Sequence, residues 1–182
     1  SKDDTVLFPE IAWGSYKLMA QEYGYQQETY QLFKDDHFHL EDFKNKCETI
    51  IQKQNKLVVV INDPCHNPTG YSLTNEEWTQ VIEILNACSK LGPVVLLNDI
   101  AYIDYSYNLD QVHKYMENFN NISDDIAIVI AFSCSKTLTS YGLRVGAAII
   151  MAKNQKDVRE IEIIFEKYAR ATWSNIANAG ME

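Results

Sequence analysis

The 182-residue chain lacks the features that would assign it to a membrane, secreted or nucleic-acid-binding class. No apolar run approaches the roughly 18 residues of a membrane-spanning helix, and the first residues are not those of a secretory signal. Basic residues are few: 16 Lys and Arg stand against 25 Asp and Glu, which gives a net charge of -9. Because such a surface repels phosphates, we expect no nucleic acid and no membrane as a partner. We therefore expect a cytoplasmic protein.

Cysteine, glycine and proline are also scarce, with 4, 7 and 4 residues. The cysteines form no CxxC pair and no histidine cluster has zinc-ligand spacing, so we expect reduced thiols and no metal. No linker, repeat or low-complexity tract divides the chain, which indicates one unit. The 46% of hydrophobic residues suffices for a buried core. The chain begins without methionine, and we expect it to be a piece of a longer protein.

Short β-branched runs alternate with helical patterns along the chain. Four such runs lie at residues 57–61, 94–97, 126–130 and 145–150. Periodicity and capping residues predict helices near residues 16–23, 40–50, 74–91 and 154–168, with a weaker one after residue 108. The runs are apolar throughout, as strands covered on both faces are. This pattern predicts an α/β fold, a three-layer sandwich in which helices flank the sheet.

The connection between the last two runs differs from the others. Between Phe132 and Val145 the chain is polar and irregular, whereas a parallel pair of strands needs a crossover of a dozen or more residues, usually a helix. The run at 145–150 should therefore lie antiparallel to its predecessor. We predict a mostly parallel, mixed sheet with one antiparallel strand.

Polar residues follow three successive runs. Asn67 lies after the first, Asp99 and Tyr102 after the second, and Lys136 and Arg144 after the third. Because ligands of open α/β sheets gather at the carboxyl ends of the strands, we predict that these side chains converge on one site. Each alone also fits a plainer role, such as a turn for Asn-Pro-Thr-Gly or a solvated surface lysine.

Three segments carry a resemblance to a known family. They are Cys65 to Gly70 (CHNPTG), Asp99 to Tyr102 (DIAY), and Ser133 to Lys136 (SCSK) with Arg144-Val145-Gly146 (RVG). Together they resemble the fold-type I, pyridoxal-phosphate-dependent aminotransferases of class I, in particular the aspartate and aromatic branch. The resemblance extends from about Phe8 to Asn178 in the family's order. It implies that residues 1–182 are the central part of the large domain of a longer, truncated aminotransferase.

The resemblance implies that four residues act at the ring of pyridoxal 5'-phosphate. Lys136 matches the lysine that forms the internal aldimine, and Asp99 matches the acid that faces the pyridine nitrogen. Tyr102 and Asn67 match the groups that hydrogen-bond the 3-oxygen, and Asn67 also matches a substrate-carboxylate contact. A carboxylate beside the ring nitrogen keeps it protonated, so that the ring accepts electrons from the substrate Cα. The lysine amine then serves as the general base.

Four further residues match the phosphate and stacking contacts of the family. Ser133 and Arg144 match phosphate ligands, Arg144 standing eight positions beyond the lysine, and Ser135 neighbours the phosphate in some members. Trp13 matches the aromatic residue that stacks on the cofactor. Three positions later, the aspartate branch usually has a histidine that supports the acid, whereas this chain has Tyr16.

The resemblance implies a homodimeric enzyme that moves an amino group between a dicarboxylic or aromatic amino acid and a 2-oxo acid. The same residues also serve lyases, synthases and decarboxylases, and some transcriptional regulators carry an aminotransferase-like effector domain. Two parts of the family have no counterpart here: the glycine-rich turn that binds the phosphate and the arginine for the substrate α-carboxylate. We therefore expect the isolated chain to bind the cofactor weakly and to be inactive.

Overall fold

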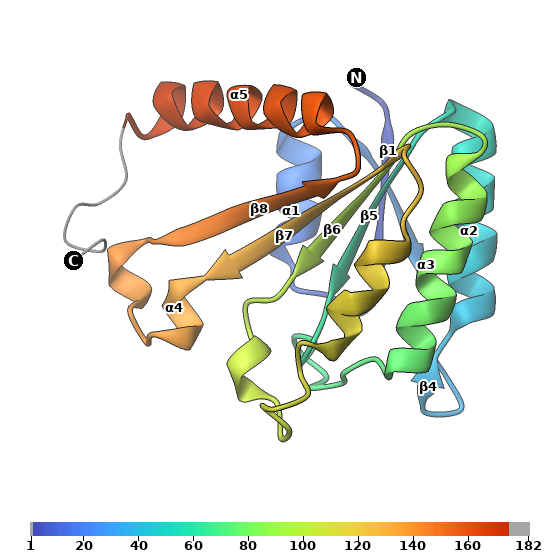
Figure 1. Cartoon of the computed structure of the whole chain (residues 1–182), viewed down its shortest axis with the longest axis horizontal. Helices are drawn as coiled ribbons and strands as arrows, with labels where there is room; N and C mark the ends of the chain where they lie inside the picture. The colour runs from blue at the N-terminus through green and yellow to red at the C-terminus, as the bar shows by residue number, and fades with distance from the viewer. Residues whose placement is uncertain (1, 175–182) are drawn as a thin grey trace.

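A six-stranded sheet forms the centre of the computed structural model, which describes residues 2–174 (Figure 1). Its strand order is β2-β1-β5-β6-β7-β8. The strands are β1 (Thr5–Pro9), β2 (Gln26–Tyr30), β5 (Leu57–Asn62), β6 (Val94–Asp99), β7 (Ile126–Ser133) and β8 (Gly146–Ala152). Neighbouring strands pair in parallel except β7 and β8, which are antiparallel. The predicted mostly parallel sheet with one antiparallel strand is confirmed.

Helices flank this sheet and complete the predicted α/β fold (Figure 1). The α-helices are α1 (Ser15–Glu22), α2 (Leu40–Gln54), α3 (Asn75–Ser89), α4 (Cys134–Thr137) and α5 (Gln155–Thr172). Three 3₁₀ segments are η1 (Ile103–Tyr105), η2 (Lys114–Asn121) and η3 (Tyr141–Leu143), and β3 (Phe33–Lys34) with β4 (His37–Phe38) forms a separate hairpin. Among the described residues, no helix has the length and apolar character needed to cross a bilayer.

The main core lies between the sheet and the pair α2 and α3. Apolar side chains at helical spacing, such as Phe43 and Cys47 on α2 and Trp78 and Leu85 on α3, are fully buried against the strands. The predicted capping box begins α3: the Thr74 hydroxyl accepts from the Glu77 N–H at 3.1 Å, and the Glu77 carboxylate accepts from the Thr74 N–H at 2.8 Å. Helices α2 and α3 therefore cover one face of the sheet.

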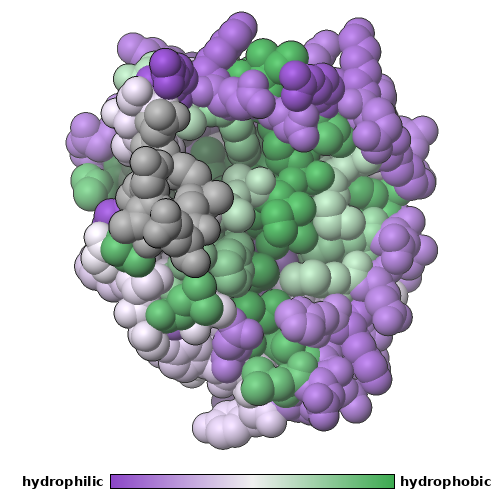
Figure 2. Space-filling model, turned by 60° about the vertical axis from the view of Figure 1, so that its left-hand side comes forward, coloured by the Kyte–Doolittle hydropathy of each residue, from purple (hydrophilic) through white to green (hydrophobic). Residues whose placement is uncertain are grey.

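The opposite face of the sheet is only partly covered. Helix α1 packs there through Tyr16 and Ala20 against Phe8 of β1 and Val60 of β5. Beyond these strands, residues on β6 and β7 alternate between buried and half-buried, and the first four residues of β8 are exposed. Figure 2 shows apolar side chains gathered in a hollow that polar side chains frame. The expectation that all four runs are covered on both faces is therefore wrong for β8, because α5 contacts this strand but leaves its first four residues exposed.

Other differences from the sequence prediction concern short elements. Strands β1 and β2 were not predicted. Strand β2 (QQETY) is a polar edge strand and has no apolar run. The weak helix expected after residue 108 is the 3₁₀ segment η2, and the irregular connection after Phe132 contains the single turn α4 and the turn η3. Asn178, the end of the resemblance, lies outside the described residues.

Candidate active site

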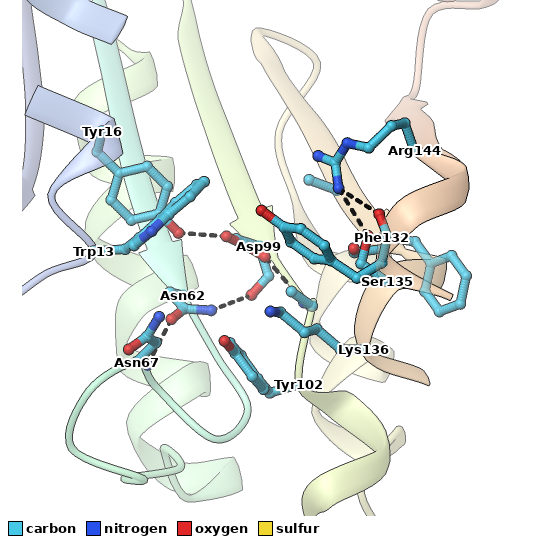
Figure 3. Close-up of a pocket in the computed structure, with 14 residues that line it drawn as sticks. Trp13, Tyr16, Asn62, Asn67, Asp99, Tyr102, Phe132, Ser135, Lys136 and Arg144 are labelled. Carbon is cyan, nitrogen blue, oxygen red and sulfur yellow. Dashed lines mark hydrogen bonds between the residues drawn. The ribbon is translucent and has the colours of Figure 1, made fainter. Parts of the chain in front are cut away.

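The carboxyl ends of β5, β6 and β7 lie side by side, since Asn62 pairs with Asp99 and Asp99 pairs with Ala131 in the ladders. A cavity of about 350 Å³ opens at this edge. All eight residues singled out in the sequence line it: Trp13, Asn67, Asp99, Tyr102, Ser133, Ser135, Lys136 and Arg144. The predicted convergence is confirmed. Tyr16 and Asn62 also line the cavity (Figure 3), as does Tyr141.

Asp99 is held at both carboxylate oxygens. Its Oδ1 accepts from the Ala101 N–H at 2.9 Å, and its Oδ2 accepts from the Tyr16 hydroxyl, a contact marked in Figure 3. Burial first, and then the charge of Asp99 and this hydrogen bond, raise the pKa of Tyr16 well above its usual range. The phenol is therefore a permanent donor to the carboxylate. Tyr16, which stands where the resemblance implied a histidine, therefore donates a hydrogen bond to Asp99.

Asn62 connects the turn that contains Asn67 to strand β6. Its Oδ1 accepts from the Asn67 N–H at 2.7 Å, and its Nδ2 donates to the Asp99 backbone oxygen at 2.9 Å. Only 3% of Asn62 is exposed, so both bonds are shielded from water. The peptide bonds before Pro64 and Pro68 in this turn are cis. The position of Asn67 relative to Asp99 is thus fixed by one buried amide.

Lys136 lies on α4 and points into the cavity near Tyr102 (Figure 3). Its Nζ is 5.5 Å from the ring centroid of Tyr102 and 5.4 Å from that of Tyr141. Ring faces attract a charged amine at this range. Below the lysine, the Tyr105 hydroxyl donates to the Lys136 backbone oxygen at 3.4 Å. The two rings therefore flank the amine, and the Tyr105 hydrogen bond holds the backbone of Lys136.

Arg144 presents its guanidinium at the other side of the cavity. Its carbon Cζ lies 4.7 Å from the Tyr141 ring centroid, and Nη1 donates to the Tyr141 backbone oxygen at 2.8 Å and to the Ser135 hydroxyl at 3.5 Å. Among the described residues, neither Arg144 nor Lys136 forms an ion pair with a carboxylate. A planar guanidinium beside a serine hydroxyl suits a phosphate or carboxylate group.

The strand that follows Arg144 requires a glycine at its first residue. Gly146 pairs with Ser133 in the β7–β8 ladder, and a Cβ at this position would lie 2.7 Å from the Phe132 backbone oxygen. No real side chain tolerates that approach, so only glycine fits. The glycine of the RVG sequence therefore has a structural reason: Gly146 lets β8 pair closely with β7.

Trp13 forms the outer wall of the cavity beside Tyr16. Its ring meets the Tyr16 ring edge-on, with centroids 5.6 Å apart and planes at 85°, and 48% of its surface is exposed. Trp13 thus lines the cavity with a partly exposed indole. Within residues 2–174, no group of three or more His, Cys, Asp or Glu side chains is arranged to hold a metal ion.

Sequence reasoning did not single out two lining residues, Asn62 and Tyr141. Asn62 stands at the last position of an apolar strand, and its burial as a polar residue at a strand end is the signal that was available. Tyr141 lies between Lys136 and Arg144 along the chain, and its aromatic ring between two cations is a second such signal. Neither residue belongs to a motif that spacing alone would reveal.

A comparison with protein families fits this geometry. The chain matches the model of the family described as aminotransferase class I and II over residues 1–179. The chain belongs to this family. The cavity described above is therefore that of a member of the class I and II aminotransferase family.

Individual aminotransferases are similar to the chain over most of its length. It is 25% identical to the aspartate aminotransferase of Pseudomonas aeruginosa, over 95% of this chain and 42% of the relative. It is 29% identical to the aromatic-amino-acid aminotransferase of the same organism, over 69% of this chain and 30% of the relative. The chain thus spans well under half the length of these curated relatives.

Solved aminotransferase structures share the fold. An aminotransferase from Anaerococcus prevotii superposes with a TM-score of 0.94 at 33% identity, over 97% of this chain and 44% of that one. An aromatic-amino-acid aminotransferase from Burkholderia pseudomallei, covalently bound to pyridoxal phosphate, superposes with a TM-score of 0.82 at 21% identity, over 98% of this chain and 43% of that one. The sheet described above is therefore the aminotransferase fold of type I.

Proposed function

We propose that this chain is the central part of the cofactor-binding large domain of a longer aminotransferase that uses pyridoxal 5'-phosphate. The observation that carries the proposal is the meeting of Lys136, Asp99 and Arg144 in one cavity, although Asp99 is far in sequence from the other two. Membership of the class I and II family supports it, as does the fraction of the relatives' length that the chain spans.

The donor set of the cavity fits this cofactor. Lys136 offers an amine for its aldehyde carbon, Asp99 a carboxylate for its ring nitrogen, and Arg144 a guanidinium for its phosphate. A volume of about 350 Å³ lies in the range of small-molecule sites. When bound, pyridoxal phosphate supplies a ring that accepts the electron pair of the substrate Cα.

The residues at the ring would divide the work between charge and proton transfer. Asp99, held by two hydrogen bonds, would place its carboxylate at the ring nitrogen. Asn67 and Tyr102 would donate hydrogen bonds to the 3-oxygen. Lys136 would take the proton from the substrate Cα and deliver it to the cofactor's aldehyde carbon. Its amine stands between the Tyr102 and Tyr141 rings and has no carboxylate partner among the described residues.

The remaining residues would hold the ends of the cofactor. Arg144, Ser133 and Ser135 would bind the phosphate, and the guanidinium already contacts the Ser135 hydroxyl. Trp13 would stack on the ring with its partly exposed indole. These residues bind and orient the cofactor without exchanging protons with the substrate.

The substrates that we propose are a dicarboxylic or aromatic amino acid and a 2-oxo acid. The support is the names of the relatives, which are aspartate and aromatic-amino-acid aminotransferases. We further propose that the full-length enzyme is a cytoplasmic homodimer. The four cysteines are free, which suits a reducing compartment, and the exposed apolar residues of β8 and α5, among them Ile149 and Phe165, suit burial in the complete molecule.

The test is a half-reaction with the full-length protein. The protein, loaded with pyridoxal 5'-phosphate, is mixed with glutamate, and we expect pyridoxamine 5'-phosphate and 2-oxoglutarate in equal amounts by chromatography. Release of carbon dioxide from glutamate, or of pyruvate from other amino acids, would instead indicate a decarboxylase or lyase. A DNA-binding segment upstream in the complete protein, with no turnover, would indicate a regulator.

A further inference from the structure

The hydroxyl of Tyr16 reaches across the fold to the acid of the cavity. Tyr16 lies on the first turn of α1, whereas Asp99 ends β6, and the two are 83 positions apart. The hydroxyl donates to Oδ2 of Asp99, while Oδ1 is taken by the Ala101 N–H at 2.9 Å. Each carboxylate oxygen thus has one protein donor, and the carboxylate cannot rotate without losing both.

The phenol ring is itself held in place. Only 8% of Tyr16 is exposed, and it packs with Phe8 and Val60 beneath α1. The Tyr16 N–H donates to the Trp13 backbone oxygen at 3.1 Å, and the Trp13 ring meets the Tyr16 ring edge-on. The segment from Trp13 to Tyr16 therefore contributes both a wall of the cavity and the donor to its acid.

The charge state of this pair has a chemical consequence. The phenol stays protonated, because burial and the neighbouring carboxylate both raise the pKa of Tyr16. A hydrogen bond to an ionised carboxylate favours the ionised form. Since the donor is neutral, it does not cancel the negative charge as a lysine or arginine would. The carboxylate remains available for a protonated nitrogen in the cavity.

We propose that Tyr16 is the positioning residue of Asp99. It holds the carboxylate in the one orientation that meets the ring nitrogen of the cofactor, so cofactor affinity depends on the Tyr16 hydroxyl. This inference rests on the proposed function. A purely structural hydroxyl would stabilise the fold but would not distinguish one cofactor ring from another.

The test compares two ligands in the full-length protein. Dissociation constants are measured for pyridoxal 5'-phosphate and for its 1-deaza analogue, in which a CH group replaces the ring nitrogen. In Tyr16→Phe we expect about tenfold weaker binding of pyridoxal 5'-phosphate, since a hydrogen bond to a charged group is lost, and no loss of affinity for the analogue. Tyr16→His, which returns an N–H donor, is expected to recover part of the preference for the nitrogen-containing ring.

Two controls isolate the Asp99 contact. Tyr30→Phe removes another buried phenol, one that donates to the Val60 backbone oxygen at 3.4 Å and does not contact Asp99, so it should keep the wild-type preference. In an Asp99→Asn background, Tyr16→Phe should cause little further loss of affinity, because the two residues act as one unit.

Two results would overturn the inference. Equal losses of affinity for both ligands in Tyr16→Phe would make the hydroxyl a structural group, and an unchanged preference in both the Phe and His variants would show that it is not used. Wild-type protein that binds pyridoxal 5'-phosphate without a bond to Lys136 would refute the proposed function itself. That failure is visible before any variant is made.

Discussion

The two halves of the cavity differ in how completely the chain holds them. Asp99, Asn62 and Asn67, at the ends of β5 and β6, form a continuous set of hydrogen bonds with Tyr16 and Ala101, and Asn62 is almost fully buried. Lys136 and Arg144, beyond β7, are held by aromatic rings and backbone contacts, and Tyr141 between them is 65% exposed. The acid half is prearranged, whereas the cationic half keeps unpaired donors that an anion can use.

The largest effect is expected in the cationic half, from Lys136→Ala in the full-length protein. Loss of the amine removes both the covalent attachment of the cofactor and the base, so activity should fall by at least about 10³-fold. The visible absorbance of the lysine-bound cofactor should also disappear in a spectrophotometric titration. Lys156→Ala on α5 removes a highly exposed lysine and should change neither quantity. A Lys136→Ala protein with wild-type absorbance would contradict the role.

The buried carboxyl of Asp63, next to Asn62 of the acid half, is expected to make the free energy of unfolding depend on pH. Burial raises the pKa of Asp63 from 3.8 to about 7, although its carboxylate accepts from the Leu73 N–H and the Trp78 Nε1–H. Because the folded state then binds a proton that the unfolded state has lost, stability should fall as the pH rises from about 4 to 7, by on the order of 4 kcal/mol at most.

Unfolding by urea at several pH values measures the effect of Asp63. Asp63→Asn should flatten this part of the profile, although the variant is less stable because an amide offers one oxygen to two donors. Asp124→Asn, at a side chain that is 83% exposed, should keep the wild-type slope. The same slope in wild type and Asp63→Asn would contradict the assignment.

A smaller effect is expected from Arg144. Arg144→Ala should weaken binding of pyridoxal 5'-phosphate by about 10- to 100-fold, the loss of charged hydrogen bonds worth about 1.5–3 kcal/mol. Arg144→Lys should lie between, since it keeps the charge but not the planar fork. Isothermal calorimetry measures the affinities. Arg159→Ala, which breaks an exposed pair with Glu162, is the control that should bind normally.

The smallest expected effect tests the link inside the acid half. Asn62→Ala leaves the Asn67 N–H without its acceptor and should cost about 1–3 kcal/mol of unfolding free energy. Asn86→Ala also removes two interactions, with Asn121 and Ser123, but far from the cavity. Both variants should melt earlier, and only Asn62→Ala should also weaken cofactor binding. Equal cofactor affinity in the two variants would separate Asn62 from the site.

The sequence predicted those parts of the fold whose signal is local. Apolar runs predicted four strands of the sheet, β5 to β8, and the capping box at Thr74 predicted the start of α3, because both depend on neighbouring residues. The polar edge strand β2 has no such pattern. The exposure of β8 was not predictable either, since periodicity shows which side chains are apolar and not whether a partner covers them.

The site was predictable to the same extent. Asp99 ends β6, Lys136 follows the end of β7 and Arg144 lies just before the antiparallel β8, so topology alone brings them to one edge. The contacts that position them cross long stretches of chain: Tyr16 reaches Asp99 from α1, and Asn62 of β5 reaches the Asp99 backbone. No spacing rule predicts such pairs, because they depend on how α1 and β5 pack in three dimensions.

The reversal of β8 decides where the two cations stand. The chain leaves the sheet after Ser133 and rejoins it at Gly146, directly opposite in the ladder. A crossover would have carried it to the far rim and left Arg144 a whole strand length from Lys136. Here Ser133 and Gly146, which flank the connecting segment, are paired at about 4.8 Å, the distance between neighbouring strands. Insertions in this segment would change its conformation, while Ser133 and Gly146 would keep their separation.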